Sequence, residues 1–119
     1  MKQIYSPDRR YVVDLETFEM RMSHWISVPC VRDNATGQPV LDLSQTLWHA
    51  DDVRWDDTGA QVILNLRHYP GDRPGIVLII DLTERSCTIK TASETLQMGV
   101  EHVAPWLEAY ANGENGGRQ

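Results

Sequence analysis

The sequence has few cysteines, no long hydrophobic run and little positive charge, and each shortage excludes a class of protein. Cys30 and Cys87 are the only cysteines in 119 residues, too few for the disulfide framework of a small secreted domain. The longest apolar run, residues 76–80, is well short of the ~20 residues that span a bilayer. No apolar targeting segment precedes the first polar turn. We therefore expect a cytoplasmic protein with no membrane partner and reduced cysteines, although the sequence does not test whether the two pair.

Basic residues are outnumbered by acidic ones, with 11 Lys and Arg against 17 Asp and Glu, giving a net charge of -6. This balance excludes the concentrated basic face that a nucleic-acid binder needs, but it would favour a basic protein partner. Five aspartates lie close together in the sequence: Asp42, Asp51, Asp52, Asp56 and Asp57. Because aspartate also favours turns, this segment is either a solvated turn region or an attractive surface.

The motifs of catalysis and of metal binding are missing. The chain has no Gly-x-Ser-x-Gly, no glycine-rich phosphate loop, no Cys-x-x-Cys and no His-x-x-x-His. His49 and Asp51 would share one strand face, but they supply only two of the three or four ligands that zinc needs. Cys30 follows a proline in an apolar strand, which is an inert position. We therefore predict no catalytic residue, no metal and no cofactor.

What the sequence does contain is a doubled turn-and-strand unit. Two pairs of segments correspond, each pair on the order of 50 residues apart: 5–13 with 55–63, and 31–40 with 79–88. Strand patterns dominate between them, and residues 76–82 are apolar enough for a strand buried on both faces. The sequence predicts a mainly β protein, an antiparallel meander or sandwich of about seven or eight strands. Its two similar halves are residues 5–45 and 52–91.

A helical pattern occurs only near the C-terminus. Four apolar residues recur there at helical spacing: Val103, Trp106, Leu107 and Tyr110. They predict one helix over residues 102–112, with Pro105 in its first turn. Residues 113–119 include no apolar side chain and are expected to form a flexible tail. Residues 1–112 should then form a single domain.

The turn chemistry resembles that of β-propeller blades. The residues that carry the resemblance are Ser6-Pro7-Asp8-Arg9-Arg10-Tyr11, the Asp33 to Thr36-Gly37 hairpin and Trp55-Asp56-Asp57-Thr58-Gly59. They are similar to the S-P-D-G and D-x-x-T-G turns of blades, with Arg9 where the blade pattern has glycine. The resemblance covers residues 5–91. Two blades cannot close a ring, so it implies an open sheet or sandwich, or copies that associate to cover their edges.

Two corners of the predicted fold carry the side chains best suited to binding. The first corner consists of Glu16, Glu19, Arg21, His24 and Trp25. The corresponding point of the second half consists of Arg67, His68 and Tyr69. Charge, imidazole and large aromatic rings together are typical of binding surfaces. If the halves pack with pseudo-twofold symmetry, the two corners would converge; alternatively, Trp25 lies in the core and the charges form a solvated strand face.

These features favour a small, non-enzymatic protein-binding module. In style the chain is similar to small acidic bacterial proteins of uncharacterised families, some of which are immunity proteins that neutralise a toxin. In that version a basic partner is attracted by aspartates and anchored by tryptophans: Asp51, Asp52, Asp56, Asp57, Trp48 and Trp55. One alternative is a ligand-binding or hydrolytic β protein that uses Glu16, His24 and Arg67. Another is a module that forms homo-oligomers through its sheet edges.

Overall fold

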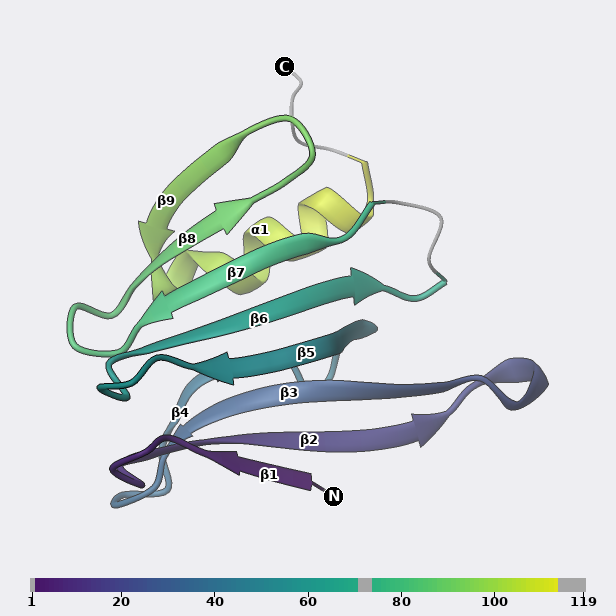
Figure 1. Cartoon of the computed structure of the whole chain (residues 1–119). Coiled ribbons are helices and arrows are strands. Elements are labelled where there is room, and N and C mark those ends of the chain that lie inside the picture. The colour runs from purple at the N-terminus through teal and green to yellow at the C-terminus, as the bar shows by residue number, and fades with distance from the viewer. Residues whose placement is uncertain (1, 71–73, 114–119) are drawn as a thin grey trace.

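The computed structural model describes residues 2–70 and 74–113, which form two antiparallel sheets and a C-terminal helix (Figure 1). The first sheet contains β1 (Lys2–Tyr5), β2 (Tyr11–Glu19), β3 (Trp25–Asp33) and β4 (Pro39–Asp42). The second contains β5 (Trp48–Trp55), β6 (Gln61–His68), β7 (Ile76–Asp81), β8 (Ser86–Lys90) and β9 (Thr95–Gly99). The 3-10 helices are η1 (Arg21–Ser23) and η2 (Val100–His102), and α1 is Val103–Ala111.

The predicted fold class is confirmed: the protein is mainly β, antiparallel, with one C-terminal helix. Within each sheet the strands follow chain order, so every pairing is between consecutive strands. The described residues form nine strands, one or two more than the pattern predicts. The strand that the pattern misses is β1, whose four residues are too few to show a periodicity. The predicted tail lies, apart from Gly113, outside the described residues.

One hydrophobic core joins the two sheets and the helix. Strands β3 and β5 run side by side where the sheets meet, and α1 covers one face of the second sheet (Figure 1). The buried cluster takes side chains from every layer, including Val13, Val31, Leu43, Trp48, Leu64, Leu78, Ile80, Val103 and Leu107. Each fully buried side chain of this size contributes about 1.5–3 kcal/mol through the hydrophobic effect. No helix in the described part of the chain is both long and apolar enough to cross a membrane.

Strand β7 is buried on one face only, so the prediction that both its faces are buried is wrong. Ile76, Leu78 and Ile80 are at most 2% exposed, whereas Val77 and Ile79 on the opposite face are half-buried. The helix covers one side of the sheet, and the other side is open. Val and Ile still suit this open side because β-branched side chains favour extended backbone.

The first pair of matched sequence segments forms two turns with the same hydrogen bonds. In the β1–β2 turn, the N–H of Arg9 donates to the carbonyl of Ser6 at 2.8 Å; in the β5–β6 turn, the N–H of Gly59 donates to that of Asp56 at 3.1 Å. The side-chain oxygens of Ser6 and Asp56 accept the N–H of the first residue of β2 and of β6, at 3.1 and 3.2 Å. Arg9 (φ 61°) and Gly59 (φ 77°) occupy the same left-handed position.

The second pair of matched segments also forms equivalent turns, between β3 and β4 and between β7 and β8. Asp33 accepts the N–H groups two and three residues further on at 2.9 and 3.4 Å, and Asp81 does so at 3.0 Å for both. Gly37 and Arg85 then take positive φ values of 77° and 54°. A doubled sequence pattern therefore forms doubled turns, because aspartate carboxylates bind nearby backbone amides.

Candidate functional site

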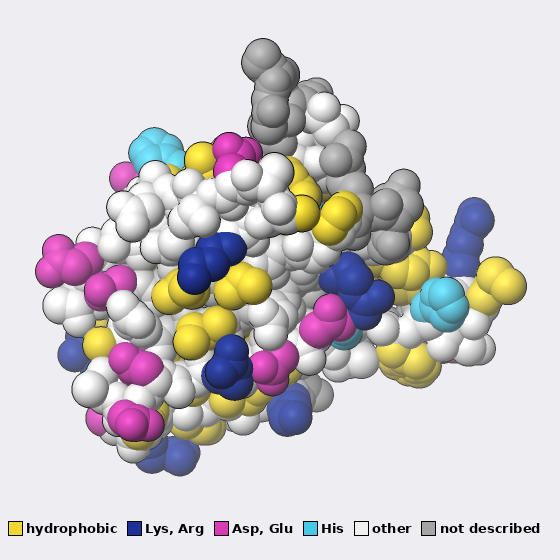
Figure 2. Space-filling view, turned by 45° about the horizontal axis from the view of Figure 1, so that its top comes forward, with side chains coloured by type: hydrophobic (Ala, Val, Ile, Leu, Met, Phe, Trp, Pro, Cys, Tyr) yellow, Lys and Arg dark blue, Asp and Glu magenta, His cyan; other side chains and the backbone are white. Residues whose placement is uncertain are grey.

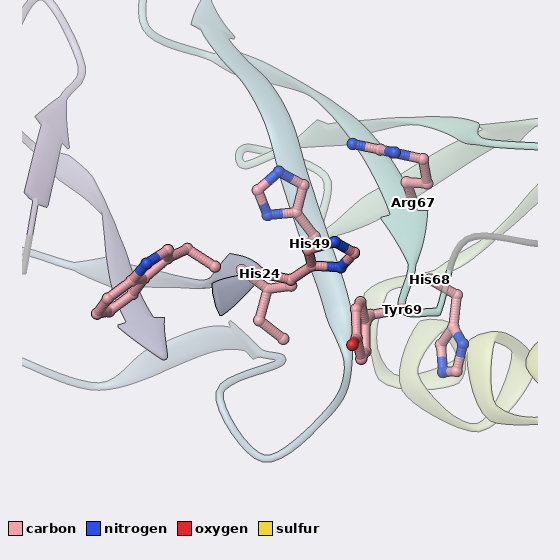
Figure 3. A pocket seen from close by; sticks show the side chains of 7 residues that line it. His24, His49, Arg67, His68 and Tyr69 are labelled. Atoms are coloured by element: carbon pink, nitrogen blue, oxygen red, sulfur yellow. The ribbon is translucent and has the colours of Figure 1, made fainter. Parts of the chain in front are cut away.

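A hollow of about 250 Å³ lies where the two sheets meet (Figure 3). It is lined by His24, Trp25, Ile26, His49, Arg67, His68 and Tyr69. Five of these belong to the two corners that the sequence analysis singled out. The structure therefore brings the two corners together at one place.

The first corner lies on a hairpin that projects beyond the rest of the molecule (Figure 1). We call its outer part, residues 16–26, the arm. Helix η1 forms the tip of the arm, and the positive φ values of Met22 and Ser23 reverse the chain there. The next residues, His24 and Trp25, then reach the hollow. The side chain of Trp25 is 59% exposed, so the alternative that it lies in the core is wrong.

The second corner comes from the end of β6 and the residue after it. Arg67 and His68 end the strand, and Tyr69 follows. The rings of His24 and Tyr69 meet edge to face with their centroids 6.1 Å apart. This arrangement is favourable for ring pairs, and it joins the arm to the second sheet. In Figure 3, the labelled side chains from both corners surround the same space.

A β-bulge in β5 places a carboxylate beside His49 and Arg67, two residues that line the hollow. The register pairs Ala50 with Leu66 and Asp52 with Asn65, so Asp51 is the extra residue. Such a bulge redirects a side chain. The carboxylate of Asp51 accepts two hydrogen bonds from the guanidinium of Arg67, at 2.8 and 3.1 Å. These bonds hold the pKa of Asp51 below its usual value.

His49 joins the two sheets through one ring nitrogen and contacts its own strand through the other. Its Nδ1 accepts the backbone N–H of Ser27 on β3 at 2.8 Å, and its Nε2 lies 3.2 Å from Asp51. A nitrogen that accepts an N–H carries no proton, so the proton of the neutral ring is on Nε2, where Asp51 accepts it. With both nitrogens engaged, His49 is not available as a general base in this arrangement.

The set Glu16, His24 and Arg67 proposed for hydrolysis is not brought together. His24 and Arg67 line the hollow, whereas Glu16 does not. Glu16 is exposed on β2, where it pairs with Val28 in the register. Arg67 is also committed to Asp51. The other two residues of the first corner, Glu19 and Arg21, are exposed on the arm and do not line the hollow.

The aspartates proposed to attract a partner take part in ion pairs and turns. Asp51 binds Arg67, and Asp52 accepts a hydrogen bond from Arg54 at 3.0 Å. Asp56 accepts hydrogen bonds from its own turn, including the hydroxyl of Thr58 at 3.1 Å. The remaining one, Asp57, is exposed in the same turn. Internal structural roles therefore occupy Asp51, Asp52 and Asp56.

The two tryptophans proposed as anchors have structural positions too. Trp48 is 1% exposed, and its ring centroid lies 6.2 Å from that of Tyr110 on α1. The structure thus corrects the expectation for Trp48, because a side chain that the core and the helix enclose offers no contact surface. Trp55 is half-buried, and its Nε1–H donates to the carbonyl of Ile4 at 3.1 Å.

The two cysteine thiols are free and protonated. Cys30 and Cys87 are free, and burial raises the pKa of Cys30 to about 11 and that of Cys87 to about 12. Both are therefore neutral thiols rather than nucleophilic thiolates at neutral pH. Within residues 2–70 and 74–113, no group of three or more His, Cys, Asp or Glu is placed to hold a metal ion.

Sequence reasoning missed part of this surface. Ile26 lines the hollow, and Phe18 and Met22 are exposed on the arm. An apolar residue in a predicted strand, such as Phe18, is normally assigned to the core, so only the length of the hairpin relative to its neighbours could have indicated its exposure. No protein family model, no curated protein and no solved structure matches this chain.

Proposed function

We propose that this protein is a non-enzymatic protein-binding module whose contact surface consists of the arm and the adjacent hollow. One observation carries the proposal. Among the described residues, four large hydrophobic side chains are exposed, and three of them are on the arm: Phe18 (41%), Met22 (89%) and Trp25 (59%). The fourth is Leu47. Apolar side chains that gather on one projecting hairpin are typical of a surface that a partner covers.

The chemistry of the surface supports binding. Tryptophan is enriched among the residues that dominate binding energy, especially where it lies beside a pocket. Trp25 has this position, because it lines the hollow and is still accessible. His49 and Arg67 line the hollow, and both contact the carboxylate of Asp51 beside it. These contacts fix the shape of the surface, and they engage all three side chains in structural interactions.

We further propose a basic partner, as an immunity-type inhibitor of a toxin would require. The net charge of -6 would accelerate the approach of such a protein. Figure 2 shows hydrophobic, His and Lys or Arg side chains on the arm at the right, and most acidic side chains on the left. On the arm itself the carboxylates are Glu16 and Glu19, both exposed and on either side of Phe18 in the sequence. They take the role that the turn aspartates were expected to have.

Capture from the native cell lysate tests this surface. The protein and its Trp25→Ala variant are immobilised side by side, with Leu47→Ala as the matched control, because Leu47 is exposed at 39% but lies outside the arm. We expect one protein to be retained by the wild type and by Leu47→Ala and to be lost from Trp25→Ala. Circular dichroism of the three proteins confirms that they fold alike. Equal capture by both variants would contradict the proposal.

Self-association through the same exposed side chains is the second candidate. It is favoured by the unpaired outer edges of β1, β4 and β9, which end the two sheets and can pair with another chain. Light scattering at two protein concentrations distinguishes the candidates. A mass that rises with concentration in the wild type but not in Trp25→Ala would assign the arm to a second copy of this chain. A constant monomer mass would instead favour a different protein as the partner of the arm.

A further inference from the structure

The contact between the two sheets is held at its two ends by side chains. At one end the Nε1–H of Trp55 donates to the carbonyl of Ile4. At the other end, beside the hollow, the N–H of Ser27 donates to Nδ1 of His49 at 2.8 Å. Strand β4 pairs with β3 only at residues 30–32, so it does not reach Ser27. The imidazole of His49 replaces the strand partner that this amide lacks.

This hydrogen bond exists in only one charge state of the imidazole. The neutral ring has one nitrogen that accepts and one that donates, whereas the protonated ring carries N–H groups on both. Protonation of His49 would therefore turn Nδ1 from an acceptor into a donor that faces the N–H of Ser27. Two donors repel each other, and the part-buried amide would lose its partner. Imidazole is the side chain whose charge ordinarily changes between about pH 5 and pH 8.

We propose that His49 is a pH-sensitive latch between the two sheets. In its neutral form it binds Ser27 and keeps β3 against β5, and in its protonated form it releases β3 and loosens the wall of the hollow. Because the closed state uses the Nδ1 lone pair, the open state binds a proton more tightly. By linkage, acid shifts the population towards the open state.

The charged groups around the His49 ring have opposing effects on its protonated form. On β5, the carboxylate of Asp51 accepts from Nε2 and favours the charged ring. On β6, the guanidinium of Arg67 binds the same carboxylate and offsets this effect. On β3, Ser27 presents only its uncharged amide to the ring. The remaining titratable groups that line the hollow are His24, His68 and Tyr69, and His24, whose ring contacts that of Tyr69, serves as the control among them.

If the hollow binds a partner as proposed above, opening the latch would weaken that contact in acid. This consequence rests on the proposed function, but the latch itself does not. The latch is tested on the protein alone, so a negative result would not contradict the proposed binding surface. A negative result in the binding experiment would likewise not contradict the latch.

Nuclear magnetic resonance of the wild-type protein provides the first test. At about pH 8 we expect the ¹⁵N shifts of His49 to show a neutral ring with its proton on Nε2. On acidification to about pH 5, the hydrogen-exchange protection of the Ser27 amide, corrected for the intrinsic pH dependence, should fall about fivefold to tenfold, the size of one hydrogen bond. A proton on Nδ1 at pH 8, or unchanged protection at Ser27 while the His49 ring titrates, would overturn the proposal.

A variant that accepts without titrating provides the second test. In His49→Asn, the side-chain amide oxygen replaces the Nδ1 acceptor, so the protection of Ser27 should no longer depend on pH. His24→Asn removes a second imidazole at the hollow, and His102→Asn removes one that is exposed on η2. Both controls should keep the wild-type pH dependence. The proposal is wrong if His49→Asn also keeps it, or if His24→Asn abolishes it. Should His49→Asn fail to fold, the wild-type measurement alone decides.

Discussion

The guanidinium of Arg67 binds the carboxylate of Asp51 with two hydrogen bonds, of 2.8 and 3.1 Å, across a β-bulge. A planar guanidinium matches a carboxylate in this two-point geometry. The same carboxylate of the extra residue also lies 3.2 Å from Nε2 of His49. The bulge in β5 therefore determines which carboxylate lies beside the imidazole of His49.

Replacing Arg67 by methionine should raise the pKa of Asp51 towards its ordinary value, because hydrogen bonding to Arg67 is the main cause of its lowering. The pair is about half exposed, so the free energy of unfolding should change by less than about 1 kcal/mol. A ¹³C titration of the Asp51 carboxyl, with Arg54→Met as the control, checks the first result. An unchanged Asp51 titration would contradict it.

The ion pair of Asp14 and Arg32 should contribute more stability, since its side chains are only 15% and 25% exposed. Arg32→Met should lower the free energy of unfolding by about 1.5–3 kcal/mol at neutral pH. The hydrogen bond from Arg32 lowers the pKa of Asp14. This stabilisation is therefore present above the ordinary aspartate pKa of about 3.9 and is lost as the pH falls through the lower folded-state value.

Urea unfolding at a series of pH values measures this effect. The difference between the wild type and Arg32→Met should be constant near neutrality and should shrink in acid. Arg54→Met, which breaks the exposed pair with Asp52, is the matched control and should cost little at any pH. A difference for Arg32→Met that does not depend on pH would mean that lost packing, not charge, is its cause.

One turn from each matched pair has a glycine at its left-handed position, Gly59 between β5 and β6 and Gly37 between β3 and β4, which allows a paired test. Gly59→Ala should be destabilising for two reasons: its φ is 77°, and the new Cβ would lie 3.1 Å from Oδ1 of Asp8 in the β1–β2 turn. Gly37→Ala has the same φ but open space around the Cβ. Strain of this kind costs on the order of 1–3 kcal/mol, so thermal unfolding should show a larger loss for Gly59→Ala. Equal losses would mean that the contact between the turns contributes nothing.

The two tryptophans that differ most in exposure should differ equally clearly in their contribution to stability. Trp48→Ala should cost about 3–5 kcal/mol, because it leaves a cavity between the core and α1. Trp25→Ala should stay within about 0.5 kcal/mol of the wild type, as for other exposed positions. Guanidinium unfolding of both variants checks the order. A large loss for Trp25→Ala would place its side chain in a packed contact instead of on a free surface.

Local chemistry explains which parts of the fold could be predicted. The turns and the helix follow from residues close together in the chain, such as Asp33 and Asp81 at the turns and Leu107 on the helix. The correspondence of the two halves indicated that the two corners would converge only if the halves packed with pseudo-twofold symmetry; His24 and Arg67, one from each corner, both line the hollow.

The rest depends on pairing between distant strands. The bulge at Asp51 arises only when β5 pairs with β6, and no local pattern indicates it. Trp48 is buried because the register and α1 place it inside, whereas its sequence neighbours allowed either face. His49 could be recognised as a partner of Asp51, but its bond to Ser27 requires two sheets that meet edge to edge. The same limit applies to the aspartates proposed as a binding surface, since composition does not show which charges already have partners within the fold.

The matched turns have a mechanical consequence. They lie side by side at one end of the contact between the sheets, where Gly59 approaches Asp8 and Trp55 binds the carbonyl of Ile4. We expect any rotation of the first sheet relative to the second to be centred on this end, and the hydrogen bond from Ser27 to His49 beside the hollow would oppose it. A small rotation of this kind would produce its largest displacement at Met22 and Trp25, on the arm at the opposite end. The residues best placed to meet a partner are therefore also those that such a rotation would move farthest.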